Sequence, residues 1–143
     1  MRAVDTNVLV FAEITSSANH SKARNLLRQL AEGPEPWAIP WPCVYEFLRI
    51  VTHPRVYHPP LTLNLALDDL GLILASPSVH LLSETHRHFE IATRILRGGS
   101  AIGNLAHDAH IAALCIEHGV RDIITGDRDF HRFPELNVVN PFA

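Results

Sequence analysis

Cysteine is scarce in this sequence, and its placement argues against two kinds of protein. The only two cysteines, Cys43 and Cys115, are far apart, and each lies among apolar residues. This pattern predicts small buried thiols in a reducing compartment rather than a disulfide framework or a CxxC zinc site. We therefore expect a cytoplasmic protein.

Long apolar runs are missing as well. No run approaches the roughly 18–20 apolar residues that a transmembrane helix needs, so no membrane segment is predicted. The amino-terminal stretch MRAVDTNVLV places Asp5 inside what would be the apolar core of a signal peptide. We therefore expect no secretion signal.

Basic residues are too few to indicate nucleic-acid binding by charge alone. The net charge is −3 and the pI is near 6.3, whereas nucleic-acid-binding domains usually have a basic excess. Of the 12 lysines and arginines, only Lys22 is a lysine. Arginine is the better ligand for phosphate oxygens, although biased codon usage explains this preference equally well.

Strand and helix patterns alternate along the chain. Strands are expected at 2–4, 36–40, 78–83, 121–125 and 137–141, and helices at 7–13, 20–33, 41–54, 63–75, 84–97 and 105–119. Thr62 and Ser83 are expected to cap their helices, and Gly33 and Gly119 to end theirs. The alternation predicts a single α/β domain over residues 1–143, with a mostly parallel sheet of about four or five strands.

Two acidic residues lie just past predicted strands. Asp5 follows the first strand in DTN, and Asp127 follows the strand at 121–125 in TGDRDF. Ligands of such sheets bind outside the carboxyl ends of the strands, so both side chains are expected at one edge of the sheet. Each also has an ordinary interpretation, because Asp-Thr-Asn suits a helix cap and Gly-Asp suits a turn.

Two further acids lie in apolar helical sequence. Asp108 shares the apolar face of its helix with Ile111 and Cys115. A carboxylate there is costly unless something neutralises it, and the helix dipole typically contributes less than about 1 kcal/mol. Glu46 is the only acid in WPCVYEFLRIV, although a solvent-exposed glutamate would account for it too.

Together the four acids predict a metal site. Carboxylates crowded in one pocket raise one another's pKa, and Mg²⁺ or Mn²⁺ relieves this repulsion. One ion lowers the pKa of a bound water, and a second ion about 4 Å away can stabilise the leaving oxygen, which suits phosphoryl chemistry. The polar residues expected to orient or supplement the carboxylates are Thr6, Asn7, Thr125 and Asp129.

The same residues occur in an order that resembles a known family. The DTNVL opening, the glutamate in PCVYEFLRIV, the GNLAHDAHIAALCIEHG helix and the IITGDRDFHRFPEL ending resemble the PIN-domain ribonucleases. Within that family they are most similar to the VapC toxins of bacterial type II toxin–antitoxin pairs. Each motif is short, but the ordered set spans essentially the whole chain.

The resemblance implies a fold, a reaction and partners. The fold is a PIN-like α/β/α sandwich, and the activity is that of a Mg²⁺- or Mn²⁺-dependent endoribonuclease with one or two ions. The catalytic and metal-binding acids map onto Asp5, Glu46, Asp108 and Asp127, with Asp129 as an auxiliary acid and Thr125 as the hydroxyl after the last catalytic strand. The implied substrate is a structured RNA such as transfer RNA or ribosomal RNA, cleaved by metal-activated water. The implied partners are a VapB antitoxin that inhibits the toxin, and a second toxin subunit in a homodimer, which forms a heterotetramer or larger assembly with the antitoxin.

Arginines are the candidate contacts for RNA phosphates. Arg49 and Arg128 are the first candidates, and Arg55, Arg94 and Arg97 are further ones.

Three other interpretations fit part of the pattern. A haloacid-dehalogenase-type phosphatase requires DxD, where this chain has Asp5-Thr6-Asn7, and a phospho-receiver domain requires a late lysine, where the only lysine is Lys22. A non-catalytic protein that binds RNA or an antitoxin would not need the complete acid set.

Two features outside the acid set have more than one interpretation. The histidine pairs His107/His110 and His86/His88 are possible zinc ligands, but neither forms HExxH, so we expect surface histidines. The helix at 63–75 is apolar enough either to bind a second subunit or to be a central core helix.

Overall fold

Five short parallel strands form the centre of the structure. They are β1 (Arg2–Val4), β2 (Trp37–Pro40), β3 (Val79–Leu82), β4 (Asp122–Ile124) and β5 (Asn137–Val139). Their order in the sheet is β3-β2-β1-β4-β5, and all four neighbouring pairs are parallel. The structure is a computed structural model that describes residues 1–143.

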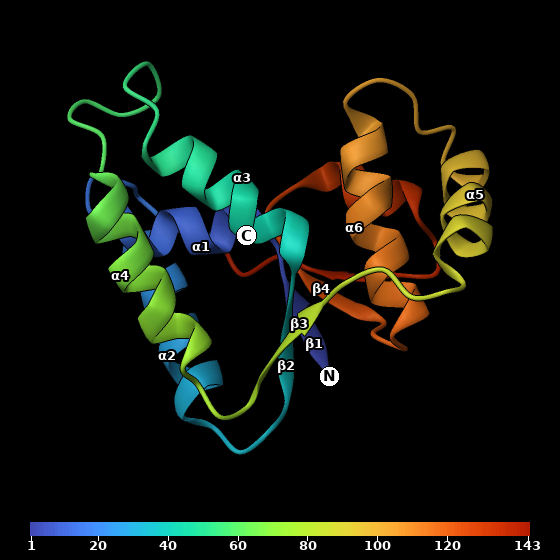
Figure 1. Cartoon of the computed structure of the whole chain (residues 1–143), viewed down its shortest axis with the longest axis horizontal. Helices are drawn as coiled ribbons and strands as arrows, with labels where there is room; N and C mark the ends of the chain where they lie inside the picture. Colours follow the sequence, from blue (N-terminus) through green and yellow to red (C-terminus); the bar gives the residue numbers. More distant parts are fainter.

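Six α-helices cover both faces of this sheet. They are α1 (Thr6–Glu13), α2 (His20–Glu32), α3 (Trp41–Val51), α4 (Leu63–Leu74), α5 (His88–Gly98) and α6 (Leu105–Glu117). In Figure 1, α1 to α4 lie on one side of the sheet and α5 and α6 on the other. Right-handed crossovers explain this, because the chain moves one way along the sheet from β1 to β3 and then returns to β4. The α/β/α sandwich predicted from the sequence is confirmed.

A single apolar cluster of 36 buried residues holds the layers together. All four residues of β2 are buried, as expected of a strand covered on both faces. The largest fully buried side chains are aromatic, namely Trp37, Phe47, Phe130 and Phe133. Burying a side chain of this kind contributes roughly 1.5–3 kcal/mol. Cys43 and Cys115 are free and buried, which confirms the prediction of buried thiols.

Local signals set several helix ends where the sequence predicts them. The Thr62 hydroxyl caps α4 by accepting a backbone N–H of the first turn at 3.2 Å. Gly119 follows α6 with a φ of 74°, a left-handed conformation that glycine adopts without strain. Helix α3 ends at Val51 rather than at 54, because Pro54 disfavours a helical backbone conformation at the residue before it.

The start of α5 differs from the prediction. The sequence predicts a helix capped by Ser83, but α5 begins at His88. Residues 83–87 form a linker held by side chains of α6 instead. His118 donates to the Ser83 carbonyl at 2.7 Å, and the Thr85 N–H donates to Glu117 at 2.6 Å. These contacts fix the linker outside any helix, so the predicted cap is wrong.

Helix α4 is a surface helix with apolar side chains exposed on two sides. Only Ala66 and Leu70 of α4 are buried. Four of its leucines, which we call the exposed α4 leucines, are Leu63, Leu65, Leu67 and Leu72. Leu63 and Leu67 share one side of the helix, and Leu65 and Leu72 share the opposite side. The interpretation of this helix as a central core helix is therefore wrong. No helix of the chain has both the length and the apolar character needed to cross a membrane.

The strand order reverses between β1 and β4, and this reversal positions the site. The register pairs Val4 with Ile124, so the next residues, Asp5 and Thr125, leave the sheet side by side. The backbone N–H of Asp5 also donates to the Ile124 carbonyl at 3.1 Å. In open parallel α/β sheets, ligands bind at this kind of reversal.

Candidate active site

Asp5 is a buried carboxylate fixed by four donors at the end of β1. Its exposed fraction is 5%. One oxygen accepts from the Thr6 backbone N–H at 2.8 Å and from the Cys43 thiol at 3.6 Å. The other accepts from the Thr125 hydroxyl at 2.7 Å and from the Asn7 amide at 3.1 Å. Burial raises the pKa of Asp5, and the hydrogen bonds from Thr125 and Thr6 oppose that rise.

Thr125 and Asn7 connect this carboxylate to the TGDRDF turn. Thr125 is fully buried. Its hydroxyl accepts from the Asn7 amide at 2.9 Å and from the Asp127 N–H at 3.0 Å, in addition to donating to Asp5. The Asn7 side-chain carbonyl accepts from the Gly126 N–H at 3.1 Å. Both residues therefore contact the groups that the sequence predicts they orient.

Three further carboxylates converge beside Asp5. Asp108 comes from the first turn of α6, and Asp127 and Asp129 come from the turn after β4. One oxygen of each of these three carboxylates lies within 4.8 Å of the others. Asp127 also accepts from the Asp129 N–H at 2.9 Å and thereby caps the short 3-10 helix η1 (Arg128–Arg132). The turn interpretation of Asp127 is therefore correct and compatible with a place in the site.

Burial and the neighbouring acids perturb the ionisation of Asp108. Burial, followed by the negative charges of Asp127 and Asp5, raises the pKa of Asp108 to about 6. The side chain is half-buried, so water cannot fully screen its neighbours. The cluster therefore favours either a proton or a cation at this position.

Glu46 lies across the cavity and is paired with a histidine. His107, one residue before Asp108 on α6, forms an ion pair with Glu46. The hydrogen bond from His107 lowers the pKa of Glu46, and the same bond raises the pKa of His107. The solvated-glutamate interpretation is therefore wrong. Sequence reasoning grouped His107 with His110, but His110 bonds to Glu84 instead, at 2.6 Å.

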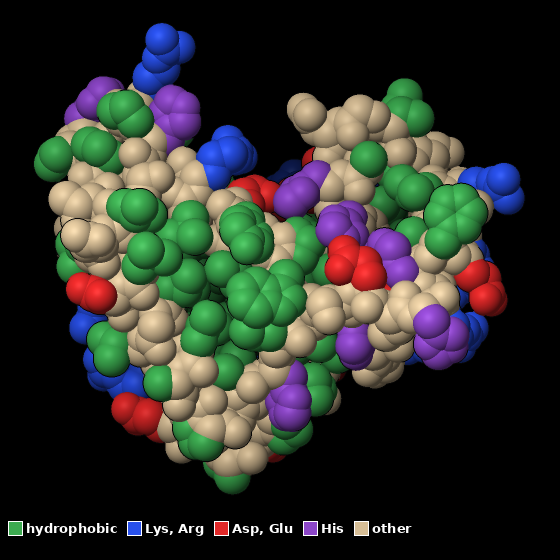
Figure 2. All heavy atoms as spheres, in the orientation of Figure 1, with side chains coloured by type: hydrophobic (Ala, Val, Ile, Leu, Met, Phe, Trp, Pro, Cys, Tyr) green, Lys and Arg blue, Asp and Glu red, His purple; other side chains and the backbone are tan.

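The site residues line one connected hollow. A cavity of about 280 Å³ is lined by all four predicted catalytic acids together with Thr6, Asn7 and His107, the acids being Asp5, Glu46, Asp108 and Asp127. A wider hollow shares several of these residues and adds Arg49 and Asp129. Figure 2 shows a notch at the top of the molecule with acidic, basic and histidine side chains at its base. Arg128 is exposed and lines neither hollow.

The donor set fits a hard divalent cation. Mg²⁺ and Mn²⁺ prefer carboxylate and water oxygens, and the carboxylates of Asp108, Asp127 and Asp129 are close enough to share one ion. The Thr6 hydroxyl is buried without a hydrogen-bond partner and belongs to a residue that lines the same cavity. Thr6 therefore differs from the prediction, because it contacts Asp5 through its backbone N–H and not through its hydroxyl.

Comparison with known proteins assigns the family. A family model described as PIN domain matches residues 2–136. The chain belongs to the PIN domain family. Ribonuclease VapC48 of Mycobacterium tuberculosis is 32% identical over 139 residues, which cover 97% of this PIN domain chain and 96% of VapC48. The resemblance to VapC ribonucleases is thus confirmed, and the phosphatase and phospho-receiver interpretations lose their support.

Solved structures share the fold of this PIN domain. VapBC2 from Rickettsia felis, solved bound to a DNA fragment from its promoter, aligns with a TM-score of 0.67 and 21% identity over 97% of each chain. VapC20 of Mycobacterium tuberculosis, described as a Sarcin-Ricin loop cleaving toxin, aligns with a TM-score of 0.66 and 19% identity over 92% of this chain and 93% of that one.

Proposed function

We propose that this PIN domain is a VapC-type toxin that cleaves RNA as a Mg²⁺- or Mn²⁺-dependent endoribonuclease. The observation that carries the proposal is the convergence of Asp5, Asp108 and Asp127 on one cavity at the carboxyl ends of β1 and β4. The raised pKa of Asp108 supports it, because a divalent cation would offset both the loss of hydration on burial and the repulsion from the neighbouring acids.

We assign the metal to the carboxylate side of the cavity. Asp5, Asp108 and Asp127 would hold the ion, with Glu46 as the fourth acid and Asp129 as the auxiliary one. When bound, Mg²⁺ or Mn²⁺ supplies Lewis acidity, which acidifies water beside the phosphate and neutralises charge that develops there.

The chain's own residues position the groups around the reacting phosphate. Thr125 and Asn7 hold the Asp5 carboxylate in one orientation. His107 is favoured in its protonated form by Glu46, so it places a positive charge beside the acids and fixes the glutamate. The Arg49 guanidinium, at the wider hollow, is placed to contact a phosphate of the RNA backbone.

We infer the substrate and partners from the relatives together with the surface of this chain. A structured RNA, such as transfer RNA or ribosomal RNA, is supported by the ribonuclease relative VapC48 and by VapC20. A cognate VapB antitoxin is supported by VapBC2. A homodimer is supported by the exposed α4 leucines, which leave apolar surface uncovered. We further infer that residues 1–143 act as one domain in the cytoplasm, where unpaired thiols stay reduced.

Cleavage of purified RNA tests the proposal. The full chain is incubated with transfer RNA or ribosomal RNA and Mg²⁺ or Mn²⁺, and the new RNA ends are sequenced, which also identifies the cut site. The wild type should cleave, and Asp5→Asn or Asp108→Asn should lower the rate at least about 100-fold. Asp68→Asn, an exposed acid on α4, is the matched control and should keep the wild-type rate.

Two results would contradict the proposal in different ways. Cleavage at full rate in EDTA would refute metal dependence. Growth arrest that survives loss of all four carboxylates would instead favour a non-catalytic protein that binds RNA or an antitoxin.

A further inference from the structure

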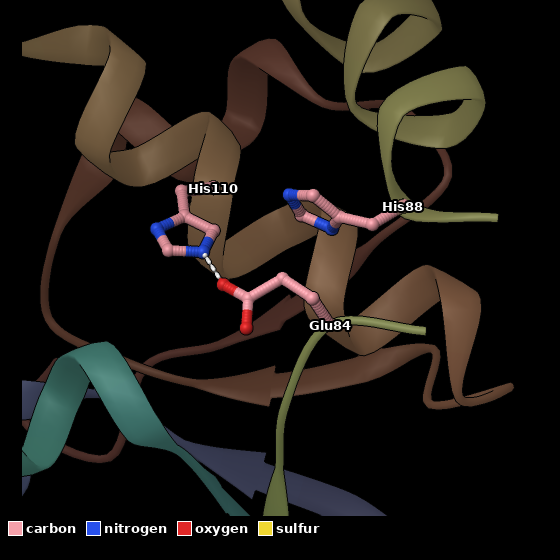
Figure 3. Close-up of side chains that lie close together, drawn as sticks. All are labelled: Glu84, His88 and His110. Carbon is pink, nitrogen blue, oxygen red and sulfur yellow. Dashed lines mark hydrogen bonds and ion pairs between the residues drawn. The ribbon is translucent and has the colours of Figure 1, made fainter. Parts of the chain in front are cut away.

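A second group of potential metal ligands lies between α5 and α6, apart from the carboxylate site. Its members are Glu84 from the 83–87 linker, His88 at the start of α5 and His110 on α6. One potential ligand atom of each lies within 4.8 Å of the others. Figure 3 shows the His88 ring and the Glu84 carboxylate directed toward His110, and Figure 2 shows histidine and acidic side chains gathered on this surface.

This group is separate from the carboxylate site, although both use α6. His110 follows Asp108 by two residues, and residues two apart on a helix do not face each other. The neighbouring His107 pairs with Glu46, whereas His110 Nε2 contacts a Glu84 carboxylate oxygen at 2.6 Å. None of the three ligands lines the catalytic cavity.

The three side chains are open enough to receive an ion. The exposed fractions of the side chains are 49% for Glu84, 24% for His88 and 35% for His110. The two imidazole rings are 5.4 Å apart between centroids, at an interplanar angle of 68°. Zn²⁺ binds nitrogen and carboxylate oxygen at about 2.0–2.2 Å, so its ligand atoms lie roughly 3.4 Å apart. Small rotations of Glu84 and His110 would reach that spacing.

A buried carboxylate orients the imidazole ring of His88 for metal binding. Glu117, whose side chain has no exposed surface, contacts Nδ1 of His88 at 2.6 Å. Histidines that bind metals almost always engage their other ring nitrogen in this way, which fixes the tautomer and the ring orientation. Nε2 of His88 is then the nitrogen available to an ion. The second oxygen of Glu117 accepts from the Thr85 N–H at 2.6 Å, so the linker is held at the same point.

We propose that Glu84, His88 and His110 form a second metal site, for a Zn²⁺-class ion, with Glu117 as a positioning residue. Two imidazoles and one carboxylate suit zinc, whereas the all-oxygen cluster around Asp108 suits Mg²⁺ or Mn²⁺. Three protein ligands leave a fourth position for water. A bound ion fastens the 83–87 linker and α5 to α6, and this role does not depend on the proposed ribonuclease activity.

The site combines one histidine from each of the pairs His107/His110 and His86/His88. His107 and His86, the other members of those pairs, belong to neither its ligands nor its supports. The expectation of plain surface histidines is therefore replaced, for His88 and His110, by a clustered arrangement that includes a glutamate from a third segment.

Cobalt titration of the full chain tests this site. Protein stripped of bound metal is placed in excess Mg²⁺, to fill the proposed carboxylate site. It is then titrated with Co²⁺ and monitored by the visible absorption of four-coordinate cobalt. We expect saturation at one Co²⁺ per chain and displacement of the cobalt by Zn²⁺. His110→Gln and Glu84→Gln should each weaken binding at least tenfold. Glu117→Gln should weaken it roughly 10–100-fold while leaving the three ligands in place.

Matched variants separate the two metal sites. His86→Gln, an exposed histidine outside the group, and Asp108→Asn, which disables the carboxylate site, should both keep full cobalt binding. Thermal unfolding of each variant without metal confirms that it is folded. Unchanged binding in both His110→Gln and Glu84→Gln would overturn the proposal, as would loss of binding in Asp108→Asn alone.

Discussion

Asp108 is a half-buried acid that faces other acids, and this makes its ionisation costly in the metal-free protein. Its pKa is raised to about 6, first by burial and then by the charges of Asp127 and Asp5. A carboxyl group whose pKa is raised on folding stabilises the folded protein at pH values below its unfolded-state pKa. That contribution is lost as the pH rises through the folded-state pKa. The metal-free protein therefore loses stability from this group between about pH 4 and pH 7.

Substitution of Asp108 should reveal this cost. Without metal at pH 8, Asp108→Asn should have a free energy of unfolding roughly 1 kcal/mol above the wild type, because the partly hydrated carboxylate is screened to some extent. Near pH 4 the two proteins should be equally stable. Saturating Mg²⁺ should stabilise the wild type and not the variant. Urea unfolding at the two pH values measures these differences, and a wild type that gains relative stability with rising pH would refute the account.

Thr125 is a buried hydroxyl that makes three hydrogen bonds within the site. Thr125→Val removes these hydrogen bonds without changing the shape of the side chain, and it leaves their polar partners buried. It should therefore lower the free energy of unfolding by about 1–3 kcal/mol and slow RNA cleavage. Thr125→Ser keeps the hydroxyl and should retain most of the cleavage rate. Urea unfolding and cleavage assays of the pair check this, and equal cleavage by the valine and serine variants would show that the hydroxyl is dispensable.

At the residue scale, the acids that line the cavity could be found in the sequence where the signal is local. Asp5 directly follows β1, Asp127 lies three residues past β4, and Asp108 interrupts an apolar helical face, so each could be selected from its own neighbourhood. The pairing of Glu46 with His107 could not be predicted from the sequence, because it joins two helices that are distant along the chain. The Glu84, His88 and His110 group was missed for the same reason, since it depends on how α5 packs against α6.

At the scale of elements, the end of α5 meets the segment after η1 at a glycine. A Cβ added at Gly99 would lie 2.6 Å from Cε1 of Phe133, a ring that is 1% exposed, whereas a Cβ at Gly98 would meet nothing within 4 Å. Gly99→Ala should therefore lower the free energy of unfolding by roughly 1–3 kcal/mol, because the core must move.

Gly98→Ala is the matched control. It adds the same methyl group one residue earlier, inside α5, and should be neutral or stabilising by roughly 0.5–1 kcal/mol. Thermal or urea unfolding of both variants measures the difference. Equal stability of the two alanine variants would show that the contact with Phe133 does not constrain the junction.

Whether a segment is a helix or a strand could be predicted from the sequence. Where a helix begins or ends could be predicted only when the capping residue is next to it in the sequence. Thr62 and Gly119 determine their helix ends through their own hydroxyl and backbone, so their positions were predictable. The start of α5 was not, because Glu117 and His118 of another helix hold the 83–87 linker in place of a Ser83 cap. Tertiary contacts override a local signal in this case.

At the scale of the whole molecule, the exposed α4 leucines offer apolar surface for a second subunit. The wild type should sediment as a dimer at micromolar concentration, and Leu72→Glu or Leu67→Glu should convert it to a monomer, because a charge would be buried at the interface. Phe89→Glu is the control, since Phe89 is exposed on α5 instead. A wild type that is monomeric, or a dimer unaffected by both leucine substitutions, would exclude α4 as the interface.

The parallel α/β architecture was predictable because alternating strands and helices leave few alternatives. The order β3-β2-β1-β4-β5 was not, because alternation indicates strand direction and not strand neighbours. That order is nevertheless what brings Asp5 beside Thr125 and makes the site. Prediction of the site therefore relied on the assumption that both strands are central, which the structure confirms.

The central claim is that one cavity of carboxylates holds the ion needed for RNA cleavage. The most direct measurement follows Mn²⁺ occupancy by electron paramagnetic resonance and the single-turnover cleavage rate in the same titration. We predict that the rate rises in proportion to Mn²⁺ bound at the site, and that Asp108→Asn loses both the bound Mn²⁺ and the cleavage. Full cleavage by the wild type before any Mn²⁺ is bound would contradict the claim.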